Sequence, residues 1–526
     1  MLSADHGLRD VTRHSYSADR TISLLLHSNS MPPFNNQYLL TDSTLPDGLP
    51  DSFITYGSVA GFTIHASKNL SVVVVQSRSE TVALLGEIFD PHDPSKTNEE
   101  IIRQVMKRPE HESIFEILQQ YSGRYIIIAE QASQIVVVPD ATCLRRVLFT
   151  ENATTITSSP KLFHELLGIE QIMDPAVKSF VNSDLFLEND AAWPGTQTVD
   201  QRLSRLLPNH YLDANEGSAQ RRPLYPPQPS DRQAVMEGLI DSLSGCLIAI
   251  AERYDDVRFP LTAGWDSRIL LAAADAIEDQ VLFYTFATKV GLNHPDVRIP
   301  FAITDQLDVD YQIIQPRELT EEFVTAMQDS YYNPRFPTKM RHVQHRYYNA
   351  NRQTSAAVVG RVAEILRVFY SPPLLEASPH LLADLYGYPQ SDFAHSEFAE
   401  WLKSAEPYAE RCDINIFDLF YWEQRMGNWG SRHTYENDIA SHQFAPFNNY
   451  NLLLSGLSIP RNERKGPDYT FFEDIVEMTR PELLSHPVNP DSKSTWRGTL
   501  KNKLRRIIND DPRLYRAKSR YKQARS

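Results

Sequence analysis

The stretch "FPLTAGWDSRILLAAADA", Phe259 to Ala276, joins a short apolar strand to a helix through a glycine-containing turn. The apolar residues up to Leu261 are typical of a buried strand, and a helical pattern follows Gly264. Backbone N–H groups at the start of such a helix point outward, and the helix dipole favours negative charge. The pattern therefore predicts a phosphate-binding loop at the end of a strand.

Three polar side chains in this loop carry the chemistry. Thr262 and Ser267 would add hydroxyl donors to the backbone amides. Asp266 would repel a bare phosphate, but it becomes useful if a divalent cation lies between carboxylate and phosphate oxygens. The alternative is that Gly264 only serves a tight turn and Asp266 only caps the helix. Spacing alone leaves both interpretations open, because short loops of this kind also arise by chance.

The sequence around the loop alternates between strand and helix patterns. After a helical segment from Arg232 come strand "VRFPLTA", helix "SRILLAAADA", strand "VLFYTFA", helix "DVRIPFAITDQL" and strand "DYQII". This order predicts an α/β, Rossmann-like parallel sheet with helices on both faces. From about Leu319 the sequence predicts mostly helix, up to a basic tail.

The N-terminal half has a different pattern. Between Thr21 and about Thr157, short β-branched runs such as "TISLLLHS", "LSVVVVQS", "YIIIAEQ" and "QIVVVPD" alternate with turn residues. One helical stretch interrupts them, so we expect antiparallel sheets in an α+β layered domain. The Pro-rich segment "RRPLYPPQPSDR" is the best candidate for a boundary. We predict domains at 1–220 and 233–490, a linker at 221–232 and a basic tail at 491–526.

Composition narrows the class of protein. A chain of 526 residues is too long for one core, and its net charge of −15 argues against a surface that coats nucleic acid. The tail has 12 Lys or Arg against 3 Asp or Glu, so acidic lipid, nucleic acid, a protein partner or a solvated helix all remain open for it. Three distant cysteines suit a reducing compartment. Apolar runs such as "SVVVVQS", "RYIIIAE" and "QIVVVPD" are far shorter than the ~20 residues of a membrane span, so we expect a cytoplasmic protein.

The residues "LTAGWDSR" resemble the pyrophosphatase loop of the asparagine synthetase family, which is written S-G-G-x-D-S. Gly264, Asp266 and Ser267 match, while Thr262 and Ala263 stand for the first Ser and Gly. The family cleaves ATP between the α and β phosphates, and its Asp binds magnesium. The resemblance implies an ATP site formed by Leu261, Thr262, Ala263, Gly264, Trp265, Ser267, Arg268, Thr285, Val359 and Gly360.

A second segment, "VVGRVAEILRVFY", occupies the place of the family loop G-[DE]-G-x-D-E-[LV]-F-G-G-Y. Aligned from Gly360, Glu364 falls on the family's second magnesium-binding Asp, and Arg361 replaces an acidic residue near the substrate. A Glu oxygen suits magnesium as an Asp oxygen does, and a guanidinium suits a carboxylate or phosphate. The resemblance implies that Asp266, Glu364 and Arg361 are catalytic and that the two acids hold Mg²⁺. The alternative is that Glu364 is a solvated helix residue.

Other parts of the chain also resemble this family. Arg425 and Met426, then Pro446 and Phe447, match points in its helical region, where most residues should pack rather than react. The N-terminal half resembles the family's glutaminase domain, an Ntn-hydrolase-like αββα fold. That domain uses an N-terminal Cys as nucleophile, whereas this chain begins Met1-Leu2-Ser3. We therefore expect a scaffold without glutaminase activity.

The function implied by the resemblance is an ATP-dependent amide-forming ligase. A substrate carboxylate would attack ATP to give an acyl-adenylate, and ammonia or an amine would then displace AMP. The carboxylate would belong to a small molecule, a peptide or a saccharide. The family also has a Lys near the C-terminal end, for which His486, Lys493 and Lys465 are candidates. The alternative is a non-catalytic nucleotide-binding homologue, and a homodimer is one expected assembly.

A few remaining residues have two interpretations each. His342 and His345 are three apart, as metal ligands on a helix would be, but a third ligand is not evident. Asp296 suits a helix start and is also a weak candidate for facing the substrate. Trp422 and Trp429 are seven apart, which favours packing on one helical face.

Overall fold

The structure is a computed structural model that describes residues 33–490 with short gaps, together with Arg513 and Ala517. The gaps are residues 79, 110, 132–133, 227–230, 288–293, 336–339, 351–353 and 373–375. The strand expected near 21–28, Lys493 and most of the basic tail lie outside the described residues.

Two six-stranded antiparallel sheets form the N-terminal half. The first has the order β10-β8-β9-β1-β3-β2 and the second β12-β11-β7-β6-β5-β4. The strands of the first sheet are β1 (Tyr38–Thr41), β2 (Phe53–Val59), β3 (Phe62–Ser67), β8 (Leu148–Thr150), β9 (Thr155–Thr157) and β10 (Leu203–Arg205). Those of the second are β4 (Val72–Gln76), β5 (Glu80–Phe89), β6 (Ser122–Gln131), β7 (Gln134–Pro139), β11 (His210–Asp213) and β12 (Ser218–Arg221).

Alternation along the strands packs these sheets into four layers. Ala83 and Leu85 of β5 face the first sheet in one buried cluster. Val82 and Leu84 point to the opposite side, where they pack with residues of α1 (Asn98–Met106). The helices on the outer faces are α1 and α2 (Ile114–Ile117) on the second sheet and α3 (Pro160–Leu167) on the first. The antiparallel layered arrangement thus agrees with the sequence pattern.

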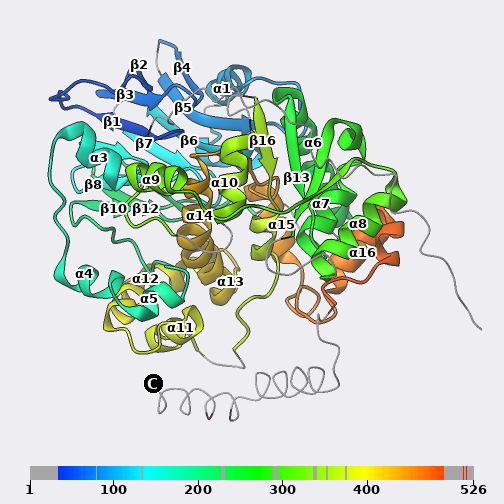
Figure 1. Cartoon of the computed structure of the whole chain (residues 1–526). Helices are drawn as coiled ribbons and strands as arrows, with labels where there is room; N and C mark the ends of the chain where they lie inside the picture. The colour runs from blue at the N-terminus through cyan, green and yellow to red at the C-terminus, as the bar shows by residue number, and fades with distance from the viewer. Residues whose placement is uncertain are drawn as a thin grey trace, which may run out of the picture. The chain divides into compact units, whose positions relative to one another are not determined.

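A five-stranded parallel sheet forms the C-terminal half, with the order β15-β14-β13-β16-β17. Its strands are β13 (Asp256–Pro260), β14 (Val281–Phe286), β15 (Tyr311–Ile314), β16 (Ser355–Val358) and β17 (His442–Phe444). Figure 1 shows β13 and β16 together, with α6 (Arg232–Arg253) and α7 (Trp265–Ala272) beside β13. The chain leaves β13 toward β14 on one side and later returns to β16 on the other. The carboxyl ends of β13 and β16 are therefore the switch point of the sheet, where α/β proteins bind ligands.

The region after Leu319 is mostly helical, as the sequence indicates, but it also supplies β16 and β17. These strands have three or four residues, too few to show a period-two pattern in the sequence. The remaining helices and helical turns are η1 (Leu118–Gln120), α4 (Pro175–Val181), α5 (Asp184–Glu188), η2 (Asp275–Gln280), α8 (Pro295–Leu307), α9 (Glu321–Ser330), α10 (Met340–Asn349), η3 (Arg361–Ile365), α11 (Pro379–Tyr386), α12 (Asp392–Arg411), α13 (Ile416–Phe420), η4 (Tyr421–Gly430), α14 (Ser431–Asn437), α15 (Tyr450–Ser458), α16 (Thr470–Thr479) and η5 (Pro481–Ser485).

The predicted linker is held firmly at its start. Arg221 donates to the fully buried Glu423, and Arg222 is itself fully buried with its guanidinium over the ring of Tyr450 at 4.1 Å. The domain boundaries remain a prediction, because these contacts join the segment to the C-terminal half without defining where a domain ends.

Helix α6 is long and apolar enough to cross a membrane by length and composition alone. Eight of its residues, including Leu243 and Cys246, are buried in the largest hydrophobic cluster of the described chain. This packing accounts for the apolar residues of α6, because a helix in the core of a globular domain meets the same criterion.

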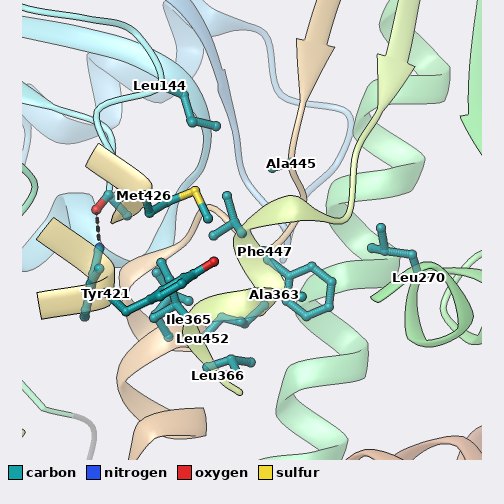
Figure 2. Packing of buried hydrophobic residues seen from close by; sticks show 14 of the residues in the cluster. Leu144, Leu270, Ala363, Ile365, Leu366, Tyr421, Met426, Ala445, Phe447 and Leu452 are labelled. Carbon is teal, nitrogen blue, oxygen red and sulfur yellow. Dashed lines mark hydrogen bonds between the residues drawn. The ribbon is translucent and has the colours of Figure 1, made fainter. Parts of the chain in front are cut away.

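The same hydrophobic cluster includes residues at the carboxyl ends of β13 and β16, where the switch point of the parallel sheet lies. In Figure 2, side chains from η3 (Ala363, Ile365) and from η4 (Tyr421, Met426) gather with Phe447 in one packed group. All five are nearly or fully buried. The matching points Met426 and Phe447 are therefore packing residues, as expected from their apolar character.

Candidate functional site

The loop after β13 is held by its own hydroxyl groups. Ser267 Oγ lies 3.1 Å from Thr262 Oγ1 and accepts the Thr262 N–H at 3.2 Å. Thr262 Oγ1 in turn accepts the Gly264 N–H at 3.2 Å. Helix α7 begins at Trp265 without a side-chain cap. The first amides of this helix therefore have no acceptor in the helix, which is the condition for binding an anion.

Gly360 allows the second predicted loop to approach the first. A Cβ atom built on Gly360 would lie 3.0 Å from Cβ of Asp266 and 3.3 Å from its carbonyl carbon. The turn η3 starts directly after Gly360 and contains Glu364. Because β13 and β16 are adjacent parallel strands, their C-terminal loops meet, and a Cβ at position 360 would make tighter contacts than most side chains do.

Asp266 and Glu364 converge on one guanidinium group. Nη2 of Arg367 lies 3.0 Å from Oδ2 of Asp266 and 3.1 Å from Oε1 of Glu364. The side chains are partly exposed, at 22% for Asp266, 26% for Glu364 and 19% for Arg367. The hydroxyl of Tyr421 donates to the other oxygen of Glu364. The structure thus brings together the two acids that the sequence paired, around a cation of the chain itself.

The electrostatics of Asp266 differ from those of an ordinary surface acid. Burial raises the pKa of Asp266 to about 7; Arg367 opposes this shift, and the nearby Glu364 carboxylate adds to it. Oδ1 of Asp266 is buried and has no hydrogen-bond partner among the described residues. A second cation beside this oxygen would stabilise the charged form, because an opposite charge lowers a carboxyl pKa.

These acids fit a magnesium ion of the kind that shares its ligands with phosphate. Mg²⁺ in nucleotide sites is held by one or two carboxylates, and substrate phosphates and water complete its shell. The described residues contain no group of three or more His, Cys, Asp or Glu side chains placed to hold a metal. Asp266 and Glu364, with the unpartnered Oδ1, would be the protein ligands, and the phosphates of ATP would supply the rest.

One loop amide is already bonded to an acid of the chain. The Ala263 N–H donates to Oδ1 of Asp296 at 3.2 Å, and Asp296 lies at the start of α8. The carbonyl of Ala263 accepts the N–H of Asn489 at 2.9 Å. Asn489 also lies next to Gly264, where a Cβ would be 3.2 Å from its side-chain oxygen. In the sequence, Asp296 was only a weak candidate, and no pattern pointed to Asn489.

Several residues predicted to bind ATP have structural partners instead. The buried Arg268 donates to the carbonyls of Leu483 at 2.9 Å and His486 at 2.5 Å, and burial lowers its pKa to about 10. Thr285 donates to the carbonyl of Leu261 at 2.7 Å. Trp265 is buried in the main core, at 6% exposed. Val359 and Gly360 are half-buried and, like the exposed Thr262, lie at the carboxyl ends of β16 and β13.

Arg361 has only neutral hydrogen-bond partners. Its guanidinium lies 3.1 Å from Oγ1 of Thr434 and 3.0 Å from Nδ1 of His433. Burial lowers the pKa of Arg361 to about 10, and Glu364 opposes this shift. The guanidinium also lies 5.8 Å from the ring centre of Trp429, whose other cationic neighbour is Arg425 at 4.4 Å.

Arg425 and Trp429 lie on η4, a ten-residue π-helix. Such helices are rare, usually span a single turn and often mark functional sites. No carboxylate pairs with Arg425 in the described part of the chain; its guanidinium lies over the rings of Trp429 and Tyr386. Arg361 and Arg425 therefore present two half-buried cations beside one indole ring, close to η3.

The other chemical candidates have ordinary roles. The ring of His342 stacks on Phe286 at 4.0 Å, and His345 packs edge-on against the same ring at 5.8 Å. Nε2 of His486 lies 3.0 Å from Oε1 of Gln306. Lys465 lies half-buried in the segment between α15 and α16. None of these positions identifies the family Lys, which remains open.

The three cysteines are not activated thiols. Burial raises the pKa of Cys143 well above its usual value and that of Cys246 to about 12, and it also raises the pKa of Cys412. Because the thiolate is the nucleophilic form, a raised pKa disfavours these three thiols as nucleophiles. The protein therefore has no cysteine suited to glutamine hydrolysis among its three, all of which the structure describes.

A parallel α/β sheet with a glycine-containing loop at its switch point defines the class of this half of the chain. No protein-family model matches the chain, and no curated protein matches it. Matches to solved structures include an NH3-dependent NAD synthetase from Campylobacter jejuni, at 13% identity over 38% of this chain and 95% of that chain, with a TM-score of 0.21.

Two further solved structures match at similar levels. An NMN synthetase from Francisella tularensis is 11% identical over 40% of this chain and 94% of that chain, with a TM-score of 0.21. A glutamine phosphoribosylpyrophosphate amidotransferase from B. subtilis is 9% identical over 68% of this chain and 84% of that chain, with a TM-score of 0.20. Similarities at these scores carry no argument, so the resemblance to asparagine synthetases remains a prediction.

Proposed function

We propose that the chain is an ATP-dependent carbon–nitrogen ligase that activates a substrate carboxylate as an acyl-adenylate. The observation that carries the proposal is the convergence of Asp266 and Glu364 on one cation at the switch point of the parallel sheet. Two acids beside the carboxyl ends of adjacent parallel strands, one of them in the first turn of an uncapped helix, suit a metal-bound triphosphate better than they suit a structural turn.

In this proposal each part of the site has one task. The amides at the start of α7, with Thr262 and Ser267, hold the β and γ phosphates. Magnesium, when held by Asp266 and Glu364, supplies positive charge beside the departing pyrophosphate. The substrate carboxylate attacks the α phosphorus, and the bond from that phosphorus to the bridging oxygen breaks. Ammonia or an amine then attacks the acyl carbon, and AMP leaves as the amide forms.

Arg361 and Arg425 are the proposed binding groups for the substrate. Both are cations without a carboxylate partner in the described part of the chain, and both lie against Trp429. A guanidinium pairs well with a carboxylate, so these residues would hold an acidic small molecule, peptide or saccharide. The nitrogen would come from ammonia, an amine or a partner protein, because the cysteines lack activated thiols. The cytoplasmic location and the homodimer remain part of the proposal.

The proposal is tested by following nucleotide products. The full chain is incubated with ATP, MgCl₂ and ammonium chloride, with mono- and dicarboxylic acids, peptides or uronic acids in turn. A ligase of this kind releases AMP and pyrophosphate in equal amounts, and only when a suitable carboxylate is present. We expect Asp266→Asn to slow AMP release by at least about a hundredfold, because metal-held charge stabilisation is lost.

The matched control is Asp279→Asn, which changes an exposed acid of η2. Its rate of AMP release should equal that of the unsubstituted chain. Formation of ADP and phosphate in place of AMP would contradict the acyl-adenylate mechanism.

A second candidate is a nucleotide-binding homologue without catalysis. Arg367 occupies the space between the two acids, and Asp296 occupies one loop amide, so the chain satisfies part of its own site. This candidate predicts that ATP binds in the presence of Mg²⁺ but that no AMP appears with any carboxylate. In that case Asp266→Asn would reduce nucleotide affinity alone.

A further inference from the structure

A small cavity of about 60 Å³ lies beside the first antiparallel sheet, and its wall contains three arginines and one glutamate. The arginines are Arg146, Arg205 and Arg432, and the acid is Glu436. Arg205 is the last residue of β10 and pairs with Leu148 on the neighbouring strand β8. Because Arg146 is only two residues before Leu148, this pairing brings the two arginines to the same end of the sheet. The opposite wall comes from η4 and α14, which carry Asn428, Arg432 and Glu436.

Arg146 and Arg205 are buried cations without a carboxylate partner among the described residues. Each is only 8% exposed. The guanidinium of Arg146 lies 4.5 Å from the ring centre of Tyr435, and that of Arg205 lies 5.6 Å from the ring centre of Trp193. Arg205 donates to the side-chain oxygen of Asn428, but its Nε is buried with no hydrogen-bond acceptor.

The one glutamate of this wall is already shared by two other arginines. Oε1 of Glu436 lies 2.9 Å from Arg432, and Oε2 lies 2.9 Å from Arg335. Burial lowers the pKa of Arg146 and of Arg205, and neighbouring arginines lower it further; Glu436 opposes the shift at Arg146 and Glu397 opposes it at Arg205, neither as an ion pair. Buried charges of one sign without partners are costly, so the cavity is suited to an anion that would compensate them.

A larger cavity of about 810 Å³ adjoins the small one and shares five lining residues with it, among them Phe186, Tyr331 and Tyr332. Its own charged residues are Asp190 and Arg335, which lie 3.3 Å apart. Asp190 also accepts the indole N–H of Trp429 at 2.6 Å. The larger cavity is therefore balanced in charge, is walled partly by aromatic rings and has the size of a site for a small molecule.

We propose that the two cavities form a binding site for a small organic anion, separate from the nucleotide loop. Its carboxylate or phosphate group lies between Arg146 and Arg205, and its body extends past Tyr331 into the larger cavity. Charged hydrogen bonds from two guanidinium groups hold the oxyanion, and the aromatic rings hold the body. The site does not depend on the ligase proposal, because none of its residues belongs to the loops that carry Asp266 and Glu364.

The test uses three probes with one phenyl body. Phenyl phosphate, benzoate and the neutral benzamide are titrated into the full chain and followed by calorimetry. We expect one molecule of at least one anion to bind, and benzamide to bind at least about tenfold more weakly, because the charged hydrogen bonds are lost. A preference between the two anions identifies the oxyanion group of the ligand.

Single substitutions locate the binding. Arg146→Gln and Arg205→Gln should each weaken anion binding at least about tenfold. The matched control is Arg103→Gln, which removes an exposed arginine of α1 and should leave the affinity unchanged. Equal affinity in Arg146→Gln, equal binding of benzamide, or no binding of either anion to the unsubstituted chain would overturn the proposal.

A crystal structure covers the case in which a substituted chain does not fold. Crystals of the unsubstituted full chain are soaked with phenyl phosphate. Density for the phosphate between Arg146 and Arg205 supports the site. Density elsewhere alone, including the loop after β13, overturns it, and that outcome leaves the ligase proposal unaffected.

Discussion

Two carboxylate–arginine groups of this protein differ in their ratio of acids to arginines and in the exposure of their side chains. At the switch point of the parallel sheet, Asp266 and Glu364 share the single guanidinium of Arg367, and all three side chains are 19–26% exposed. Between β6 and the end of α14, Asp438 faces Arg124 at 2.5 Å and Arg145 at 3.8 Å, and these side chains are 1–3% exposed.

The difference shows what each group is suited to do. Two acids around one arginine leave room for a further cation, and partial exposure lets that cation exchange with solvent. One acid held by two buried arginines has no such freedom and joins the two halves of the chain. Similar distances therefore suit cation binding in the proposed site and cohesion in the buried group, and the ratio of acids to arginines makes the difference.

The largest expected effect concerns the buried group. Asp438→Asn leaves Arg124 in the interior without a negative partner, so the free energy of unfolding should fall by about 3–5 kcal/mol. Urea unfolding followed by fluorescence measures this loss. The double substitution Arg124→Met with Asp438→Leu should recover part of it, since of the three buried charges only that of Arg145 then remains.

The control for this prediction is Glu99→Gln in the exposed pair with Arg103, where each side chain is 55% exposed. An exposed pair within one helix contributes about 0.3–0.5 kcal/mol. Equal losses for Asp438→Asn and Glu99→Gln would contradict the cohesive role of the buried group.

The next effect tests the close approach of the two loops. In Gly360→Ala, the added Cβ meets Cβ of Asp266 at 3.0 Å and its backbone at 3.3 Å. Backbone must move, so we expect a loss of about 1–3 kcal/mol in stability and weaker nucleotide binding. Thermal unfolding measures the loss of stability, and titration with ATP measures the nucleotide affinity. Gly238→Ala, a helical site of α6 with open space around it, should instead gain about 0.5–1 kcal/mol.

The third effect is the pH dependence of metal binding. Because burial raises the pKa of Asp266 to about 7, its carboxyl is mostly protonated below that pH, and the proton competes with a cation. Affinity for Mn²⁺, followed by electron paramagnetic resonance, should therefore rise about tenfold from pH 6 to pH 8. Asp266→Asn should remove this rise, and an unchanged profile in that variant would assign the titration to another group.

The smallest effect concerns the cation that the chain itself supplies. Arg367→Met removes the guanidinium between Asp266 and Glu364, so a metal no longer competes with it. We expect Mn²⁺ affinity to rise about fivefold, the size of a partly exposed ion pair. The control is Arg103→Met, with no change. Weaker metal binding in Arg367→Met would show that Arg367 positions the acids for the metal.

The fold was readable in the sequence where the elements are long and regular. The β-branched runs of β4, β6 and β7, and the alternation of strands and helices from β13 to β15, could be predicted because apolar residues recur at regular intervals along the chain. Short strands such as β16 and β17 lack such a pattern, and they form because neighbouring strands offer them partners. The two loops were also readable, because Gly264, Asp266, Gly360 and Glu364 lie in short segments that resemble a known pattern.

The contacts between segments far apart in the chain could not be predicted from the sequence. Arg367 lies 101 positions from Asp266, and its place in the aligned loop carries no acid or cation in the family pattern. Asn489 contacts the loop from the far end of the domain. No short motif connects such residues, so Tyr421, Asn489 and the cavity arginines were missed.

The sequence by itself determined which segments become strands, helices and loops, and which residues at the loops are acids or hydroxyls, because these depend on neighbours in the chain. Only the tertiary structure decided which charges meet, since that depends on strand order and on burial. It placed one arginine between two acids at the sheet's switch point. It also left Arg146 and Arg205 buried together without an ion-pair partner among the described residues, while Glu436 in the same cavity wall pairs with Arg335 and Arg432.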